Sequence, residues 1–278
     1  MDARDRSSLP RHASPQSRAA LPRDVAATPA MDPIFDEVLE RGLNDLALKL
    51  DAGARAAIDT HVRLLMAWNE HVNLSGLRTA EQIARGHVLD SLIAVPAMRA
   101  LGAERPTLLD LGSGGGFPGL PVAVALPARR AALVDSIGKK AAFLEAAAAA
   151  AKDVIAIEVL AERAEDLAEK PDQREGWDIV TARAVGSVAE VAELGLPLVR
   201  VGGHVVAWKL AGPGLNAEIA AAVRIVRAVG GERAGLVELP LADKLGLPGH
   251  CLVVIEKIRP TPDGYPRAPG ERRRRPLP

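Results

Sequence analysis

The chain has 278 residues, of which 48% are hydrophobic and 25% are charged, and its formal net charge is zero. This composition is that of an ordinary globular protein with one full core and a small appendage. No apolar run approaches the roughly 18 residues of a membrane span. Cys251 is the only cysteine, which excludes an intrachain disulfide and a cysteine-based zinc site. We expect a cytoplasmic protein that binds no metal.

Composition divides the chain into three regions. Residues 1–30 are rich in Arg, Ser, Pro and Ala without an apolar period, which predicts a disordered basic tail and makes Met31 a candidate true start. Residues 31–258 are expected to form the folded domain, and residues 259–278 return to a basic tail rich in Pro and Arg. The body between the tails is mildly acidic, so a polyanionic partner would be met by local patches and tails.

Apolar spacing predicts the elements in chain order. Helical periodicity predicts an N-terminal helical cap over about residues 31–105, with helices at Ile34 to about Leu50, about Ala54 to Trp68 and about Ala80 to Ala100. Short apolar runs then predict strands at Thr107–Leu111, Ala131–Asp135, Val154–Leu160, Trp177–Thr181, His204–Trp208 and Cys251–Glu256. Helices are expected between them at Lys139–Lys152, Ser187–Val199 and Asn216–Val229. This alternation predicts an α/β fold, a mostly parallel Rossmann-like sheet with helices on both faces.

A glycine cluster follows the first predicted strand. Leu108 to Gly119 read LLDLGSGGGFPG, a strand that runs into a tight turn with a helix opening near Pro118. Glycine permits positive φ and close approach of a ligand to the main chain, so Gly112 and Gly114 are candidate cofactor contacts. The free N–H groups of a helix N-terminus favour an anionic or polar ligand. A nucleotide-type cofactor is the first hypothesis, and a purely structural turn is the alternative.

Two cofactor classes fit this cluster. Gly114, Gly116 and Gly119 have the G-x-G-x-x-G spacing, and Asp135 lies where a ribose-binding acid is expected, so an NAD-dependent oxidoreductase remains an alternative. Asp110 favours another class, because the strand residue that leads into a dinucleotide loop is usually apolar. The pattern D-x-G-x-G-x-G resembles the first motif of methyltransferases that use S-adenosylmethionine, which is the favoured cofactor.

Several segments together resemble one family. They are WNEHVNLSGL at Trp68–Leu77, HVLDSL at His87–Leu92, and then LLDLGSGGGFPGLP, LVDSIGKK, ERAED, TARA and LVVIEK in order. From about Ile34 to Pro278 the chain is similar to the glucose-inhibited division protein B family, and Tyr265, Pro266 and Arg267 resemble the family's ending. The resemblance implies a class I methyltransferase that transfers a methyl group from S-adenosylmethionine to N7 of guanine 527 in 16S rRNA. The expected partner is 16S rRNA or the small ribosomal subunit, and we expect a monomer.

The same resemblance implies cofactor contacts at Gly112 and Phe117, at Ala164 and Glu165, and at Arg183. From residue chemistry, Asp135 at the end of the second strand is a candidate acceptor for both ribose hydroxyls. Three alternatives stay open. The alternative for Asp135 is a helix N-cap, for Arg183 a surface ion pair, and for Glu165 a place on a solvated helix face.

Methylation of guanine N7 makes modest chemical demands. N7 has a lone pair and no proton, so the enzyme has to align the reactants and needs no general base. No catalytic acid or base is therefore assigned. Lys209 and Arg183, after the fifth and fourth strands, are candidates to orient guanine O6 or a phosphate, with a snorkelling surface lysine as the alternative for Lys209. Cys251 lies in a late apolar strand and is expected to be inert, which argues against cysteine-dependent pyrimidine methylation.

Contacts to RNA are expected mainly from basic side chains. Lys139, Lys140 and Arg163 should converge with Arg183 at the carboxyl edge of the sheet and neutralise phosphates, unless they form an ordinary helix face. A further candidate is the run Arg272–Arg275, either a phosphate clamp or a solubilising end.

Aromatic residues amount to only 3% of the chain, so platforms for stacking on bases are scarce, and Phe117, Trp68 and Tyr265 are the candidates. In one departure from the family, Gly249 and His250 stand where an arginine is often found. At neutral pH His250 would grip RNA phosphate less well than arginine. A small-molecule methyltransferase and a binding module with a degenerate site remain the other hypotheses.

Overall fold

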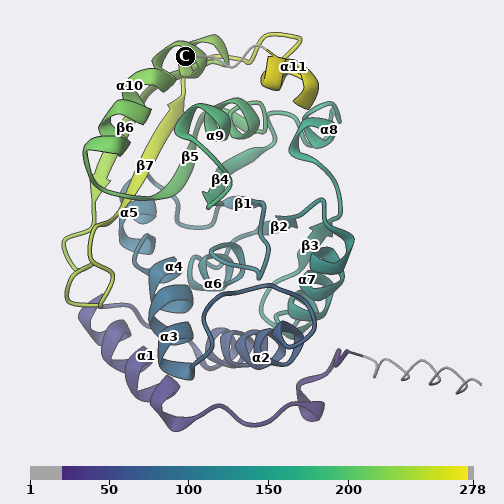
Figure 1. Ribbon diagram of the computed structural model, residues 1–278, viewed down its shortest axis with the longest axis vertical. Coiled ribbons are helices and arrows are strands. Elements are labelled where there is room, and N and C mark those ends of the chain that lie inside the picture. Colours follow the sequence, from purple (N-terminus) through teal and green to yellow (C-terminus); the bar gives the residue numbers. More distant parts are fainter. Residues whose placement is uncertain (1–20, 275–278) are drawn as a thin grey trace, which may run out of the picture.

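A computed structural model describes residues 21–274, which contain one seven-stranded sheet of order β3-β2-β1-β4-β5-β7-β6 (Figure 1). The strands are β1 (Thr107–Leu111), β2 (Arg130–Val134), β3 (Ile157–Leu160), β4 (Trp177–Arg183), β5 (Val199–Leu210), β6 (Gly231–Glu238) and β7 (His250–Lys257). The first five are mutually parallel, whereas β7 runs antiparallel between β5 and β6. The strand order reverses between β1 and β4, where such sheets bind their ligands beyond the carboxyl ends.

Helices cover both faces of the sheet (Figure 1). One face carries α6 (Gly119–Ala125), α7 (Gly138–Ala150) and the cap, which consists of α1 (Pro33–Asp45), α2 (Ala52–Asn69), α3 (Ala80–Ile83), a π-helical turn η2 (Ala84–Leu89), α4 (Asp90–Leu92) and α5 (Val95–Ala100). The other carries α8 (Ala164–Ala168), α9 (Val188–Gly195) and α10 (Pro213–Ala228). Neighbouring strand residues alternate between the two cores, so Leu108 packs with the cap side and Leu109 with α8–α10. No helix within residues 21–274 is long and apolar enough to span a membrane.

The predicted α/β sheet with helices on both faces and a helical cap is confirmed, with differences at element level. Strand β5 starts at Val199 rather than His204, and the helix predicted from about Ala80 to Ala100 is divided into α3, η2, α4 and α5. Strand β6 was not predicted, because as an edge strand it keeps six of its eight residues exposed or partly exposed and carries charges such as Glu232 and Arg233. Strand β3 starts at Ile157 rather than Val154, since a turn follows α7. The helix predicted to reach Val199 ends at Gly195, because Val199 already belongs to β5.

The N-terminal segment 21–30 is packed against the cap, so the prediction of disorder is wrong for these residues, and residues 1–20 lie outside the described part. The indole Nε1 of Trp68 donates to the Pro22 carbonyl at 2.6 Å. The Arg63 guanidinium donates to the carbonyls of Pro29 and Thr28, both at 2.8 Å. The segment is held through its main-chain carbonyls, so its own side chains need no apolar period. The sequence pattern therefore did not reveal that it packs.

Deleting residues 1–30 is therefore expected to lower the free energy of unfolding by about 1–3 kcal/mol, because the buried indole N–H of Trp68 loses its acceptor. Urea unfolding of the truncated and full-length chains would measure the loss. Deletion of residues 1–20 is the matched control, since it keeps every contact described above. Equal stability of all three proteins would show that segment 21–30 contributes nothing.

The C-terminal segment 259–274 also packs against the domain. Arg174 donates to the carbonyls of Thr261 at 3.1 Å and Tyr265 at 2.9 Å. Arg267 forms a two-pronged ion pair with the buried Glu193, with both side-chain bonds at 2.7 Å. The segment ends in the short helix α11 (Pro269–Arg274), which lies beside α8 (Figure 1). The composition boundary at residue 259 is therefore not the end of the packed structure.

Candidate functional site

The glycine turn after β1 is tied to the end of β2. Gly112 and Gly114 have φ of +64° and +54°, values that favour glycine. The Ser113 hydroxyl donates to the Asp110 carbonyl at 2.9 Å and accepts from the backbone N–H of Val134 at 3.1 Å. These two hydrogen bonds fix the turn to the ends of β1 and β2, at the carboxyl edge of the sheet.

Asp135 connects this turn to the start of α7. Its Oδ2 accepts from Gly114 N at 3.0 Å and its Oδ1 from Ile137 N at 2.9 Å. The N-cap position of α7 is Ile137, which makes no side-chain capping bond, so Asp135 is not the N-cap of that helix. A carboxylate oxygen accepts more than one hydrogen bond, and Asp135 therefore keeps lone pairs for ligand hydroxyls.

A cavity of about 250 Å³ opens beside Asp135, between the ends of the first four strands. Its lining brings together Gly112, Asp135, Ala164 and Glu165 from the predicted cofactor set, with Arg163 from the predicted RNA set. The remaining lining residues are Leu111, Val134, Ser136, Glu162, Val185, Glu190, Leu194 and Arg272. Four carboxylates against two guanidinium groups make this cavity favourable for a ligand with net positive charge.

Asp110, the acid of the glycine motif, lies beneath the turn with no exposed surface. Its Oδ1 accepts from the Thr181 hydroxyl at 2.6 Å, while its Oδ2 has no hydrogen-bond partner within the described residues. Burial raises the pKa of this carboxyl to about 6. A Cβ at Gly119 would lie 2.6 Å from the Cβ of Asp110, so the start of α6 requires glycine there.

Phe117 is buried between two histidine rings. The ring centroids of His61 and His87 lie 4.4 Å and 4.5 Å from that of Phe117. His61 Nε2 lies 2.7 Å from the Gly115 carbonyl, which accepts only, so Nε2 carries the proton. Burial lowers the pKa of His61 to about 4. The prediction that Phe117 and Trp68 stack on RNA bases is wrong, because both rings are 4% exposed and packed inside the protein.

Arg183 points inward from the end of β4 into a polar cluster. Its Nη1 donates to Asp90 Oδ2 at 2.6 Å, and its Nη2 donates to His87 Nδ1 at 2.9 Å. Asp90 is 2% exposed and also receives a hydrogen bond from His250 Nδ1 at 2.7 Å. Arg183, 18% exposed, therefore pairs with a buried carboxylate, contrary to the surface-pair alternative, and its hydrogen bonds are to the cap rather than near Lys139, Lys140 and Arg163.

The contacts of Arg183 also fix the protonation of His87. Because guanidinium only donates, His87 Nδ1 must accept, and the proton sits on Nε2, 2.6 Å from Ser75 Oγ. Burial, and then the charge of Arg183, lower the pKa of His87 to about 3. His87 is thus a neutral ring with both nitrogens engaged.

His87 and Asp90 received no role from sequence reasoning. The signal was their spacing of three residues, which puts the two polar side chains on one face of the predicted helix. The π-helical turn over Ala84–Leu89 lies at the same place, and such turns often occur at functional sites. His250, predicted as a weak phosphate ligand, instead bonds Asp90 with its Nδ1.

Lys209 is held by hydrogen bonds, and Cys251 is buried. The Lys209 ammonium donates to the Gly186 carbonyl at 2.7 Å and to Glu218 Oε1 at 2.6 Å, which ties β5 to α10. Cys251 is 2% exposed in β7, and burial raises the pKa of its thiol, in agreement with the inert role expected for it.

The rim residues are more open. Lys139 and Arg163 are exposed at the starts of α7 and α8, and Lys140 is half-buried with its Nζ 3.9 Å from Asp135. Tyr265 is half-buried against the core beside α9. Within residues 21–274 no group of His, Cys, Asp and Glu is arranged to hold a metal ion.

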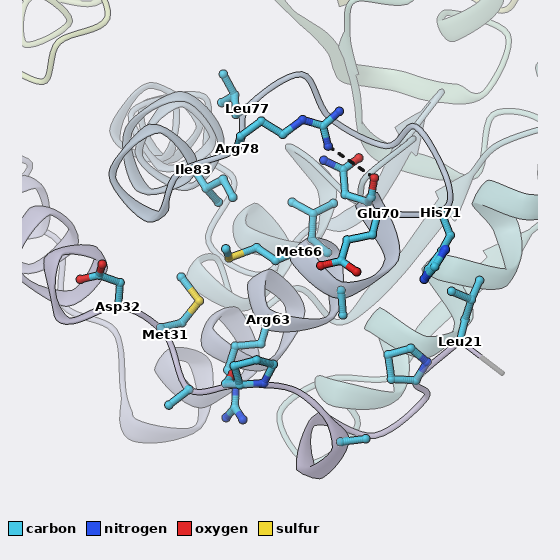
Figure 2. Close-up of a pocket in the computed structure, with 17 residues that line it drawn as sticks. Leu21, Met31, Asp32, Arg63, Met66, Glu70, His71, Leu77, Arg78 and Ile83 are labelled. Carbon is cyan, nitrogen blue, oxygen red and sulfur yellow. Dashed lines mark hydrogen bonds between the residues drawn. The ribbon is translucent and has the colours of Figure 1, made fainter. Parts of the chain in front are cut away.

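A larger cavity, of about 550 Å³, lies on the cap (Figure 2). Met31, Met66 and Ile83 line it together with residues of the N-terminal segment such as Leu21. Arg78, on its edge, donates to the Asn69 carbonyl at 3.4 Å. No residue of the glycine turn takes part in this cavity, so we place the chemistry at the strand ends.

The strand order, the glycine turn after β1 and the acid after β2 together define a class I, Rossmann-like methyltransferase fold. The GidB family, described as rRNA small subunit methyltransferase G, matches residues 55–233. Ribosomal RNA small subunit methyltransferase G of Roseiflexus castenholzii is 39% identical over 245 residues, covering 87% of this chain and all of that protein. The chain therefore belongs to the rRNA small subunit methyltransferase G family, whose enzymatic class is that of S-adenosylmethionine-dependent rRNA methyltransferases.

A further relative and a solved structure are also similar to this chain. The Moorella thermoacetica protein of the same name is 36% identical over 242 residues, covering 87% of this chain and 98% of that protein. Among solved structures, a putative RNA methyltransferase from Pyrococcus horikoshii shares 16% identity at a TM-score of 0.43, over 61% of this chain and 83% of that one. The fold assignment rests on the strand order itself.

Proposed function

We propose that the protein transfers the methyl group of S-adenosylmethionine to N7 of a guanine in 16S rRNA, guanine 527 by family resemblance. The observation that carries the proposal is the cavity at the strand-order reversal, where Gly112, Asp135 and Glu165 meet. Membership of the rRNA methyltransferase family supports the class of substrate.

The residues of the cavity fit this cofactor. Asp135 would hold the ribose hydroxyls, and the positive-φ backbone at Gly112 would admit the cofactor close to the main chain. The carboxylates of Asp135, Glu162, Glu165 and Glu190 complement the net positive charge of a ligand with a sulfonium and an ammonium group. Bound there, S-adenosylmethionine supplies an electrophilic methyl group.

The protein's own part in the reaction is orientation. Guanine N7 carries no proton, and no free base is needed, in keeping with His87, whose two nitrogens are engaged by Arg183 and Ser75. The Arg183 guanidinium carbon lies 5.7 Å from the centroid of the Phe117 ring, which belongs to the glycine motif. The three hydrogen bonds of Arg183 leave two of five donors for guanine O6 or a phosphate. Lys209, held by Glu218, is the second candidate.

Asp135→Ala is expected to weaken S-adenosylmethionine binding by about 1–3 kcal/mol, the usual effect of losing charge-assisted hydrogen bonds. Titration calorimetry with S-adenosylmethionine, and with NAD as the competing cofactor, would measure it. Lys139→Ala, an exposed neighbour, is the matched control and should bind normally. Unchanged affinity in Asp135→Ala would assign the carboxylate to loop structure alone, and binding of NAD in place of S-adenosylmethionine would overturn the function.

The substrate is tested separately by mass mapping of rRNA from a strain that lacks the gene. Loss of one N7-methylated guanine, restored by the purified enzyme on 16S rRNA or the small subunit, is the expected result. An unchanged rRNA methylation pattern would favour a small-molecule methyltransferase. We further propose that the protein is a cytoplasmic monomer, and sedimentation would measure its oligomeric state. Lys139, Lys140 and Arg163 are proposed to contact RNA phosphates, which the salt dependence of RNA binding would test.

A further inference from the structure

A cavity of about 390 Å³ opens at the edge of the sheet opposite the glycine turn. Its walls come from α5 and the loop that follows it, from the residue before β2, and from the first halves of β4 and β5. Because these strands are parallel, the cavity lies at their amino ends, whereas Gly112 and Asp135 follow the carboxyl ends of β1 and β2. The charged residues of its lining are Arg99, Glu104, Arg105, Arg129, Asp178 and Arg200.

The lining has an excess of positive charge. Four guanidinium groups face two carboxylates, and His204 adds no charge at neutral pH, because burial lowers its pKa. One carboxylate is shared by two arginines, since Asp178 Oδ2 accepts from Arg129 Nη2 at 2.8 Å and its Oδ1 accepts from Arg200 Nε at 2.5 Å. The backbone N–H and the hydroxyl of Thr107 also donate to Oδ2, at 2.7 Å and 2.9 Å. A carboxylate has about four acceptor positions, so Asp178 is fully engaged while positive charge remains.

Most guanidinium donors of this cavity are unused. The side chains of Arg129 and Arg200 are 59% and 51% exposed, and within the described part of the chain they use one and two of their five donors. Arg99 donates to the Ala125 carbonyl at 3.2 Å, and Arg105 makes no hydrogen bond or ion pair with any residue that the structure describes. One concave site therefore offers many N–H donors, with two of its guanidinium groups held in place.

Phosphate is the anion that this arrangement fits. A guanidinium group binds two phosphate oxygens through parallel N–H bonds, and it is more weakly hydrated than an ammonium group. The cofactor cavity has the opposite character, because four carboxylates there face two guanidinium groups. The folded body as a whole is mildly acidic, so the cavity at the amino edge is a local site of attraction for a polyanion.

The rRNA substrate of the family is such a polyanion. Strand β1 has five residues, so the two edges of the sheet are only about 17 Å apart at that strand, at a rise of about 3.3 Å per residue. A folded rRNA is larger than this distance and can contact both edges at once. We propose that Arg99, Arg105, Arg129 and Arg200 bind backbone phosphates of the rRNA substrate, at a distance from the guanine that is methylated. This inference rests on the proposed function, in which rRNA is the substrate.

The test measures binding of 16S rRNA, purified from a strain that lacks the gene, to the full-length protein over a range of salt concentrations. Arg105→Gln/Arg129→Gln removes two charges and leaves Arg200 paired with Asp178. Each lost phosphate contact lowers the slope of log K against log salt by about 0.7 on single strands and about 0.9 on a duplex, values taken from DNA. We therefore expect the slope to fall by about 1.4–1.8. Affinity for S-adenosylhomocysteine should be unchanged, because the two cavities share no residue.

Three further variants serve as controls. Arg224→Gln/Arg233→Gln removes the same charge from exposed positions on α10 and β6, outside the cavity, and should keep the slope of the unaltered protein. Arg105→Lys/Arg129→Lys keeps both charges at the cavity and should also keep the slope, because release of counterions depends on charge. If Arg105→Gln/Arg129→Gln loses S-adenosylhomocysteine binding through misfolding, Arg99→Gln/Arg105→Gln, which breaks no ion pair, carries the same expectation.

Equal slopes for Arg105→Gln/Arg129→Gln and Arg224→Gln/Arg233→Gln would overturn the inference. Calorimetric titration with tripolyphosphate, in the absence of RNA, tests a free phosphate compound as the occupant. Saturable binding of tripolyphosphate combined with equal rRNA slopes would assign the cavity to such a compound and overturn its role in RNA binding. Failure of the unaltered protein to methylate 16S rRNA would overturn the proposed function instead, so the two failures are distinguishable.

Discussion

Arg183→Met is expected to lower the free energy of unfolding by about 3–5 kcal/mol, the usual effect of removing one partner from a buried ion pair. The side chain of Asp90 is 2% exposed, and without Arg183 its charge would be left with the hydrogen bond from His250 alone. His87 Nδ1 would lose its donor at the same time. Urea unfolding at neutral pH, extrapolated to water, would measure the effect.

The double variant Arg183→Met/Asp90→Asn serves as the control for this prediction. Removing both charges takes away the unpaired buried carboxylate, so the double variant should be more stable than Arg183→Met alone. Arg163→Met, which changes an exposed arginine after β3, should change stability by less than about 0.5 kcal/mol. A loss below about 1 kcal/mol in Arg183→Met would mean that the Asp90 cluster does not depend on this ion pair.

Patterns of apolar residues predicted the elements that are largely buried. Strands β1 and β2 are almost wholly buried and read as apolar runs, and their predicted bounds lie within one residue of the structure. Strand β6 lies at the sheet edge and contains charged residues and two glycines, so no apolar run marked it. Its place is set by pairing with β7, a long-range contact that local sequence does not encode.

The cofactor site was predictable as far as it follows the strand ends. Gly112 and Asp135 come directly after β1 and β2, and Glu165 lies in α8, the helix that follows β3; parallel strands bring their carboxyl ends to one edge. The partners of these residues were not predictable, since Arg272 is far from Glu165 in the chain and His250 far from Asp90. Such contacts depend on how α11 and β7 pack, and composition alone made the C-terminal segment resemble a free tail.

Acidification from pH 6 to pH 4 should reveal three buried groups with opposing effects on stability. His61 and His87 have pKa values lowered from 6.5 to about 4 and about 3, so the unfolded chain takes up their protons first and stability falls with pH. The pKa of Asp110 is raised from 3.8 to about 6, so the folded protein takes up that proton first and gains stability. For the three groups together, the unfolded chain binds about one proton more than the folded protein between pH 6 and pH 4. The free energy of unfolding therefore falls by roughly 1.4 kcal/mol for each pH unit of acidification.

Asp110→Asn is expected to steepen this loss. The amide mimics the protonated carboxyl and removes its compensating effect, so the slope between pH 6 and pH 4 should approach two protons, roughly 2.7 kcal/mol per pH unit. His61→Gln, which keeps a donor for the Gly115 carbonyl, should instead make the slope shallower by about one proton. Urea unfolding at several pH values gives the slopes, and differences between variants cancel the other carboxyl groups. Equal slopes for the unaltered protein and Asp110→Asn would mean that the Asp110 carboxyl already loses its proton at its ordinary pKa in the folded protein.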